Sequence, residues 1–325
     1  MSEQSDLSTA ARAAVPLRLF HSAFSWRTLI RMSCGVLIAW LVFATMITAL
    51  QRRLVFVGYR SGAKTAMPLP ADSEGRVFPV EVPDEGANDA GFIRGWLCFA
   101  AEAESVSAGV SAGRPLVLYF GGNASNRGRR MRSVELFNRL GCDVLIVDYR
   151  GFADNQGSPS EAALFEDAQA VWDFATGGLG VDASRAVICG ESLGGAVASN
   201  LAADVCRGGT RPAGLILRAT FASLVETAAY HYPFVPVRVL LVDRFRTIDV
   251  VADISCPILQ FHGVKDQIVP FRHGRELFKA APEQSAGGVP KEWVTLRNAG
   301  HNNILWVDGD VVAAECGEFL RRVLK

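Results

Sequence analysis

The sequence predicts an α/β fold in which a mostly parallel sheet carries helices on both faces, preceded by an N-terminal transmembrane helix. Two observations lead to this prediction. Apolar runs of strand length recur from residue 115 onward, most of them separated by helix-length segments with apolar residues three and four apart. Such an alternation is typical of a parallel sheet that is covered on both sides. The second observation is an uncharged stretch of 19 residues, Met32 to Leu50, because roughly 20 apolar residues cross a bilayer as a helix.

The composition is that of a folded chain without a charge bias. Half of the 325 residues are apolar, and 33 basic residues balance 33 acidic ones, which argues against nucleic acid as a partner. The seven cysteines are scattered singly, without a CxxC pair, and we expect them to be small buried hydrophobic residues. The sequence holds no cluster of metal ligands and no cofactor motif, so we expect neither a metal nor an organic cofactor.

The first 90 residues divide into three parts. Residues 1–28 read as a polar tail, residues 29–50 as the membrane anchor, and residues 51–90, rich in Pro, Gly and acids, as a linker and first strand region. A cleaved signal peptide competes with the anchor, but the preceding region is long and no small-x-small site follows. A buried soluble helix would have a polar face, which this stretch lacks.

The expected protein is therefore a single-pass membrane protein, and its orientation stays open. Positive charges on the two sides of the apolar stretch nearly balance, so they do not indicate which side of the membrane carries the rest of the chain. The basic residues before the stretch are Arg12, Arg18, Arg27 and Arg31, and those after it are Arg52, Arg53, Arg60 and Lys64.

Residues 91–325 are expected to form the α/β domain. Residues 91–100 form a first strand there, and the low-complexity residues 100–113 read as an exposed loop. In such sheets the chemistry lies at the carboxyl ends of the strands. The following strands are expected at Pro115–Phe120, Cys142–Val147, Ala186–Cys189, Gly214–Leu217, Pro257–Phe261 and Trp293–Leu296.

One serine lies where a strand must turn into a helix. The stretch GESLGG, residues 190–195, matches the GxSxG pattern of a nucleophile elbow in the context that the pattern requires. Glycines on either side allow strand and helix to approach closely, and the turn holds Ser192 in a strained backbone conformation. The helix N-terminus below the serine favours negative charge. We therefore predict Ser192 as a nucleophile, against the alternative of a plain glycine-rich turn.

A nucleophilic serine needs a base and an acid that orients it. His301, in the loop after the strand KEWVTLR, is the predicted base, whereas His262 directly follows its strand and reads as a structural histidine. Asp266, a few residues beyond the preceding strand, is the predicted acid, and a solvated turn is its alternative. The chain order Ser192, Asp266, His301 is the order expected for a triad on a nucleophile-elbow fold.

The reaction also needs two donors for the oxyanion. We expect one to be the backbone amide of Leu193, at the start of the helix, and the other to be that of Asn123. Asn123 lies in LYFGGNASN, where two glycines allow the backbone to approach the substrate, and an ordinary turn is the alternative.

Five motifs in this order resemble those of a known family. LYFGGNASN, DYRGFADNQGSPSE, GESLGG, HGVKDQIVP and AGHNN resemble the membrane-anchored α/β-hydrolases of the abhydrolase-domain, Bem46-like family, over roughly residues 50–325. The resemblance implies an α/β-hydrolase fold and a serine hydrolase on a single-pass anchor. This chain departs from it at two places, because many relatives have histidine at Gly121 and glycine at Ala153.

The sequence thus predicts a serine hydrolase that cleaves an ester or thioester through an acyl-enzyme, acting on a small-molecule or lipid-like acyl substrate. Two alternatives stay open: a peptidase or amidase on the same triad, and a non-catalytic membrane-tethered scaffold with the same fold. Residues 221–250, apolar and aromatic, are read as a small lid or as packing on the sheet. For Arg127, Arg129, Arg130 and Arg132, the pattern favours a solvated helix start over contact with an anionic substrate or phosphate headgroups.

Overall fold

The computed structural model describes residues 26–58, 67–71, 73–84, 91–111, 113–124 and 126–324. The chain divides into two compact units, of which the first ends at Met46 and the second begins at Ile47. Residues 1–25 of the expected tail, and Arg60 and Lys64 of the expected linker, lie outside the described residues.

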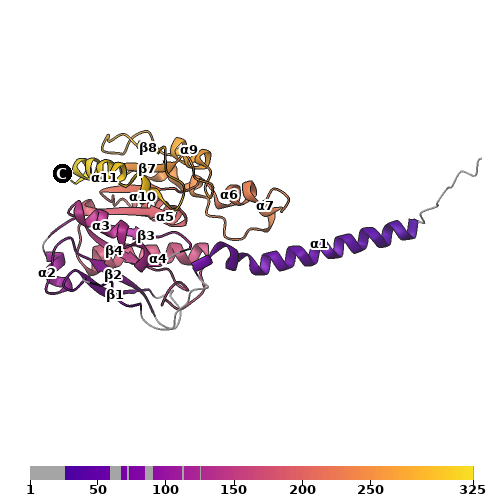
Figure 1. Ribbon diagram of the computed structural model, residues 1–325, viewed down its shortest axis with the longest axis horizontal. Helices are drawn as coiled ribbons and strands as arrows, with labels where there is room; N and C mark the ends of the chain where they lie inside the picture. The colour runs from indigo at the N-terminus through magenta and orange to yellow at the C-terminus, as the bar shows by residue number, and fades with distance from the viewer. Residues whose placement is uncertain are drawn as a thin grey trace, which may run out of the picture. The chain divides into compact units, whose positions relative to one another are not determined.

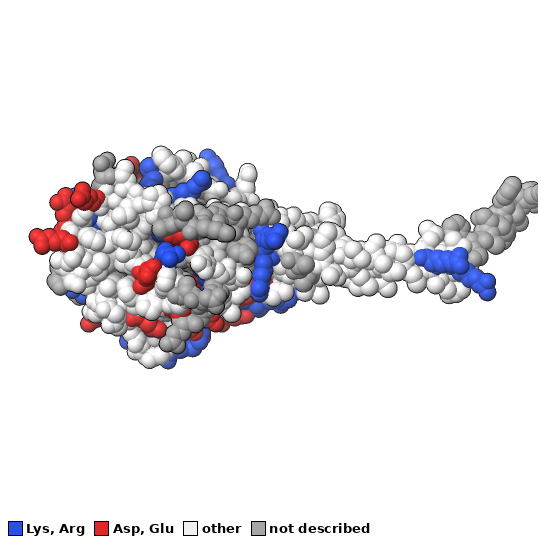
Figure 2. Space-filling model, turned by 90° about the horizontal axis from the view of Figure 1, so that it is seen from below, with Lys and Arg blue, Asp and Glu red and all other residues white. Residues whose placement is uncertain are grey.

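Helix α1 (Trp26–Val55) contains the expected anchor. Its segment Trp26–Met46 is long and apolar enough to cross a membrane, and no charged residue stands between Arg31 and Arg52 (Figure 2). By length and composition alone, the same segment also fits a signal sequence.

The second unit is built on an eight-stranded sheet with the order β1-β2-β4-β3-β5-β6-β7-β8 (Figure 1). Strands β1 and β2 pair antiparallel, as do β2 and β4, and all further pairs are parallel. This confirms the predicted mostly parallel sheet. The strands are β1 (Val77–Pro83), β2 (Phe92–Cys98), β3 (Leu116–Phe120), β4 (Asp143–Val147), β5 (Ala186–Glu191), β6 (Gly214–Arg218), β7 (Ile258–Gly263) and β8 (Glu292–Leu296).

Helices cover both faces of this sheet, and the pleat of β3 separates the two cores. Leu116, Leu118 and Phe120 belong to one core, with residues of α4 (Glu161–Asp173), α5 (Leu193–Arg207) and α9 (Phe271–Ala280). Val117 and Tyr119 point to the other face, where α3 (Met131–Arg139) and α11 (Gly309–Val323) pack. Strands buried on both faces explain why the sequence shows continuous apolar runs there.

Shorter elements connect these layers. Residues 100–113, expected to be a loop, contain helix α2 (Val106–Ser111), so this expectation was incomplete. The segment 221–250 forms α6 (Leu224–His231), α7 (Val237–Leu240) and α8 (Thr247–Val250). The remaining elements are the turns η3 (Arg127–Arg130), η4 (Phe174–Gly178), η5 (Ala183–Arg185) and η6 (Val251–Asp253), and the short helix α10 (Ile304–Val307).

Five of the cysteines are buried, as the sequence predicted. Cys34 is exposed on α1, and Cys206, at the end of α5, is half-buried, so the prediction was wrong for these two. A hydrogen bond from Cys256 lowers the pKa of the Cys206 thiol to about 5 despite its partial burial.

Candidate active site

Ser192 lies in the sharp turn between β5 and α5. Its backbone has φ 53° and ψ −117°, a conformation that is strained for a residue with a side chain. Two glycines make the turn possible by close approach: a Cβ on Gly190 would overlap the carbonyl of Gly194, and a Cβ on Gly194 would overlap the carbonyl of Phe120. The serine therefore stands at the carboxyl end of β5, directly before the N-terminus of a 15-residue helix.

Asp266 and His301 lie in two neighbouring loops. Asp266 follows β7 and His301 follows β8, which are adjacent parallel strands. A hydrogen bond of 3.0 Å from Lys265 N to Ala299 O joins the two loops. His301 Nε2 lies 2.9 Å from Ser192 Oγ, and His301 Nδ1 lies 2.7 Å from Asp266 Oδ2. The structure thus brings the three predicted side chains into one hydrogen-bonded chain.

The surroundings of Asp266 keep it charged. Its Oδ1 accepts hydrogen bonds from Ile268 N at 2.9 Å and Val269 N at 2.8 Å. Burial opposes the charge, but hydrogen bonds from His262 and His301 hold the pKa of Asp266 below its usual value. A charged carboxylate accepts a hydrogen bond from the Nδ1–H of His301, and this tautomer leaves Nε2 free to accept a hydrogen bond from the serine hydroxyl.

His262 lies closer to this site than the sequence indicated. The residue is within β7 and fully buried, and its Nε2 lies 2.9 Å from Val269 O, which fits the structural part predicted for it. The same nitrogen also lies 3.4 Å from Asp266 Oδ2. The sequence HGVKD held a signal for this contact, since His262 and Asp266 stand four residues apart there. One tight turn at the end of the strand brings their side chains together.

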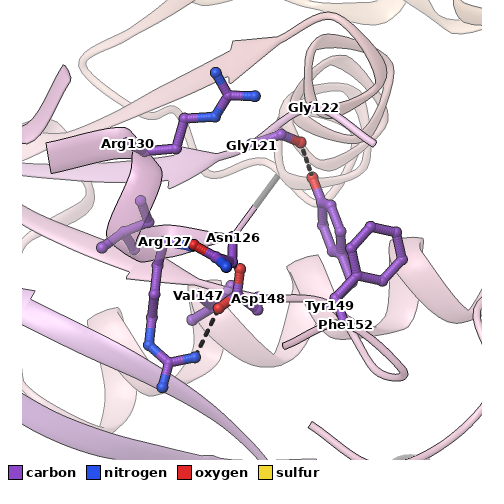
Figure 3. A pocket seen from close by; sticks show the side chains of 10 residues that line it. Gly121, Gly122, Asn126, Arg127, Arg130, Val147, Asp148, Tyr149 and Phe152 are labelled. Atoms are coloured by element: carbon purple, nitrogen blue, oxygen red, sulfur yellow. Dashed lines mark hydrogen bonds and ion pairs between the residues drawn. The ribbon is translucent and has the colours of Figure 1, made fainter. Parts of the chain in front are cut away.

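The loop with the expected second oxyanion donor lies beside the serine. A Cβ on Gly122 would stand 3.5 Å from Ser192 Cβ, in ordinary van der Waals contact, so the backbone of this loop passes next to the serine. Tyr149 Oη donates to Gly121 O at 3.0 Å and holds the start of the loop (Figure 3). Asn123 is held from the other side, since its side chain donates to Val55 O at 2.7 Å. The Leu193 amide is the first of α5, where the helix supplies no acceptor of its own.

A buried ionic cluster next to Ser192 was not foreseen from the sequence. Glu191 ends β5, and its carboxylate contacts Arg218, Arg130 Nη1 at 2.7 Å and Tyr119 Oη at 2.9 Å. Burial opposes its charge, but the two guanidinium groups lower the pKa of Glu191 to about 2. Glu191, Arg218 and Tyr119 lie at or near the carboxyl ends of neighbouring strands, which was the available signal.

The structure contradicts the expected solvated helix start at Arg127. It is only 3% exposed, and its Nη1 lies 2.6 Å from both Asp148 and Asp154. Burial raises the pKa of Asp148 to about 6, against the attraction of Arg127. The side chains of Arg127 and Arg130 point in opposite directions from η3 (Figure 3). Arg127 thus holds the loop after β4, whereas Arg130 faces Glu191.

Residues 221–250 form a segment of three short helices beside the Asp266 loop. His231 is the last residue of α6, and its Nε2 lies 2.8 Å from Ile268 O. The cavity that residues 244–250 help to line lies over α5, at Ala196 and Asn200. Several large apolar side chains of this segment face solvent, among them Phe234, which is 98% exposed.

No group of three or more His, Cys, Asp or Glu side chains that could hold a metal ion occurs among the residues with described positions. The arrangement itself offers a serine hydroxyl within hydrogen-bonding distance of an imidazole, and a carboxylate that contacts the other nitrogen of that imidazole. Such a set of side chains can activate a serine as a nucleophile.

Known proteins resemble this chain in sequence and in fold. A family model described as "Serine aminopeptidase, S33" matches residues 112–246. An uncharacterized protein of Mycobacterium tuberculosis is 36% identical over 280 residues, which cover 85% of this chain and 89% of that protein. The lysophosphatidylserine lipase ABHD12 of Danio rerio is 30% identical over 292 residues, which cover 82% of this chain and 75% of the lipase.

Two solved structures share the fold at low sequence identity. The esterase Pf2001 of Pyrococcus furiosus has a TM-score of 0.62 at 15% identity, and the match covers 82% of this chain and 98% of the esterase. An α/β-hydrolase of Vibrio vulnificus has a TM-score of 0.64 at 19% identity, covering 82% of this chain and 93% of that one.

Proposed function

Because this chain belongs to the abhydrolase-domain family of α/β-hydrolases, we propose that it is a serine hydrolase that cleaves an acyl ester or thioester. In this proposal Ser192 is the nucleophile, His301 the general base and acid, and Asp266 the residue that orients the imidazole. The backbone amides of Leu193 and Asn123 stabilise the oxyanion. The observation that carries the proposal is the hydrogen-bonded chain from Ser192 Oγ through His301 to Asp266, at 2.9 and 2.7 Å.

The reaction proceeds in two halves. Ser192 Oγ attacks the acyl carbon while its proton passes to His301 Nε2, and the carbonyl oxygen becomes an oxyanion. The C–O or C–S bond to the leaving group then breaks, and His301 returns the proton to that group. In the second half, water attacks the acyl-enzyme and gives its proton to His301. The bond between the acyl carbon and Ser192 Oγ then breaks, His301 returns the proton to Oγ, and the acid product is released.

The strained serine argues for catalysis rather than for a scaffold. A left-handed conformation costs about 1–3 kcal/mol and persists only where the surrounding structure enforces it. A binding protein gains nothing from a serine held in this way between two glycines, opposite an imidazole with a buried carboxylate behind it. The scaffold alternative therefore lacks an observation in its favour.

We also propose a lipid-like acyl substrate and a membrane anchor. The named relative from Danio rerio is a lysophosphatidylserine lipase, and the apolar segment of α1 has the length of a bilayer crossing. Residues 221–250 serve as a small lid in this proposal. Their solvent-facing apolar side chains, with Tyr232 at 61% exposed and Phe234 at 98%, suit contact with an acyl chain or with lipid.

A comparison of scissile bonds tests the proposed reaction. The full-length protein in neutral detergent is offered p-nitrophenyl esters, acyl thioesters and aminoacyl p-nitroanilides. We expect ester or thioester hydrolysis that Ser192→Ala and His301→Ala abolish, while Ser107→Ala, at an exposed serine of α2 outside the proposed site, retains it.

One observation favours a peptidase as the second candidate, namely the aminopeptidase description of the matching family model. Cleavage of the anilides without ester hydrolysis would select this candidate. Absence of every activity in folded wild-type protein would contradict both candidates.

A further inference from the structure

A small cavity beside His301 is lined by more positive charge than its one acid can balance. Its volume is about 110 Å³. A space of this size holds several water molecules, so it has room for a phosphate or carboxylate group. Among the described residues, its wall contains the charged residues Glu191, Arg129, Arg130, Arg132 and Arg218 besides His301.

The inner part of this cavity holds the one acid of its described wall. Glu191 pairs with Arg218 and with Arg130 Nη1, so its single negative charge is shared by two guanidinium groups. The two guanidinium groups together carry one positive charge more than Glu191 balances, and Arg130 Nη1 is already engaged by its carboxylate.

The outer part of the cavity wall contains two arginines that have no carboxylate partner among the described residues. Neither Arg129 nor Arg132 forms an ion pair with a residue whose position is described. Arg132 is nevertheless fixed, since its guanidinium lies 4.0 Å from the centre of the Trp306 ring and its Nε donates to Leu305 O at 3.1 Å. These contacts leave its two terminal amino groups for a ligand, in the fork geometry that suits phosphate and carboxylate oxygens.

The position of the cavity indicates which half of a substrate enters it. His301 forms part of its wall, and in a serine hydrolase the histidine protonates the leaving group. The distance to the nucleophile is short, because a Cβ on Gly122 would lie 3.5 Å from both Arg130 Nη2 and Ser192 Cβ. A group in the cavity therefore belongs to the leaving group, a few bonds from the scissile carbonyl.

We infer that Arg132, with Arg129 and Arg130, binds an anionic oxygen group carried by the leaving group of the substrate. The ligand chemistry is a phosphate or a carboxylate. This inference rests on the proposed hydrolase function at Ser192 and adds a specificity-determining site to it. Arg132 acts by binding the leaving group and takes no part in the proton transfers.

Three esters with one acyl chain test the inference. The full-length protein in neutral detergent hydrolyses decanoyl-glycerol 3-phosphate, the decanoyl ester of glyceric acid, and neutral decanoyl-glycerol, and decanoic acid release gives kcat/KM for each. We expect at least one anionic ester to be preferred over the neutral one by about tenfold or more, the gain typical of a charged hydrogen bond. The preferred anionic ester identifies the group as phosphate or carboxylate.

Two variants locate the preference. Arg132→Gln is expected to reduce the ratio of anionic to neutral kcat/KM by about tenfold. Arg139→Gln removes the same charge two turns further along α3, from an exposed arginine, and should leave the ratio as in the wild type. Equal kcat/KM for all three esters, or an equal loss of the ratio in both variants, would overturn the inference.

Failure of the proposed function gives a different result. In that case the neutral ester is not hydrolysed by the wild type, or its hydrolysis persists in Ser192→Ala. Hydrolysis of the neutral ester that depends on Ser192, without any preference for an anion, refutes the arginine site alone.

Discussion

Replacing Glu191 by glutamine should destabilise the protein by an amount that depends on pH. The pKa of Glu191 is lowered from 4.5 to about 2 in the folded protein, against burial, by Arg218 and Arg130. A shift of one pKa unit corresponds to about 1.4 kcal/mol, so the charged carboxylate contributes about 3 kcal/mol to the free energy of unfolding. Because the folded pKa is the lower one, this contribution is fully present above about pH 4.5 and is lost as the pH falls towards 2.

Urea unfolding of the full-length protein in neutral detergent, followed by tryptophan fluorescence, measures this effect. We expect Glu191→Gln to be less stable than the wild type by about 3 kcal/mol at pH 6–7, and the two free energies to converge as the pH approaches 2. Glu135→Gln is the control, at an exposed glutamate of α3, and should differ little from the wild type at any pH. A Glu191→Gln deficit that stays constant from pH 7 to pH 3 would refute the reasoning.

Three further perturbations follow from the structure. Ala153 has φ 49°, so Ala153→Gly should raise the free energy of unfolding by about 0.5–1 kcal/mol, measured by urea unfolding; an unchanged or lower value would contradict this geometry. Asp266→Asn should lower kcat for ester hydrolysis on the order of 10⁴-fold, because the amide no longer holds His301 in the required tautomer; a loss below tenfold would argue against Asp266 as the orienting acid. The lowered pKa of Cys206 predicts that it reacts with iodoacetamide at pH 6, and Cys256→Ala should slow this reaction by removing the hydrogen bond that stabilises the thiolate; an unchanged rate would exclude that cause.

The positions of the central strands β3 to β7 along the chain could be predicted because these strands are buried on both faces. Such strands appear in the sequence as continuous apolar runs. All strands from β3 to β8 begin and end within two residues of the expected positions, although β8 is less buried than the others. Short helices gave no comparable signal. Helix α2 lies in a stretch of Ala, Ser and Gly without apolar periodicity, so residues 100–113 read as a loop.

The candidate triad could be predicted because each residue stands next to a strand end that local pattern locates. The cluster around Glu191 was not predicted. Glu191, Arg218 and Tyr119 stand at or near strand ends, but no local pattern pairs them with one another or with Arg130 of η3. The same holds for Arg127, whose two ion-pair partners, Asp148 and Asp154, lie in the loop after β4. Sequence placed Arg127 correctly at a helix start, but its burial depends on where the loop after β4 folds.

The central claim is that Ser192 is an activated nucleophile, and covalent capture tests it most directly. A fluorophosphonate probe reacts with a serine whose proton a neighbouring histidine removes. Tandem mass spectrometry of the labelled full-length protein should find the adduct on Ser192, with labelling absent in Ser192→Ala and strongly reduced in His301→Ala. Folded wild-type protein that stays unlabelled, or an adduct on another serine, would contradict the account.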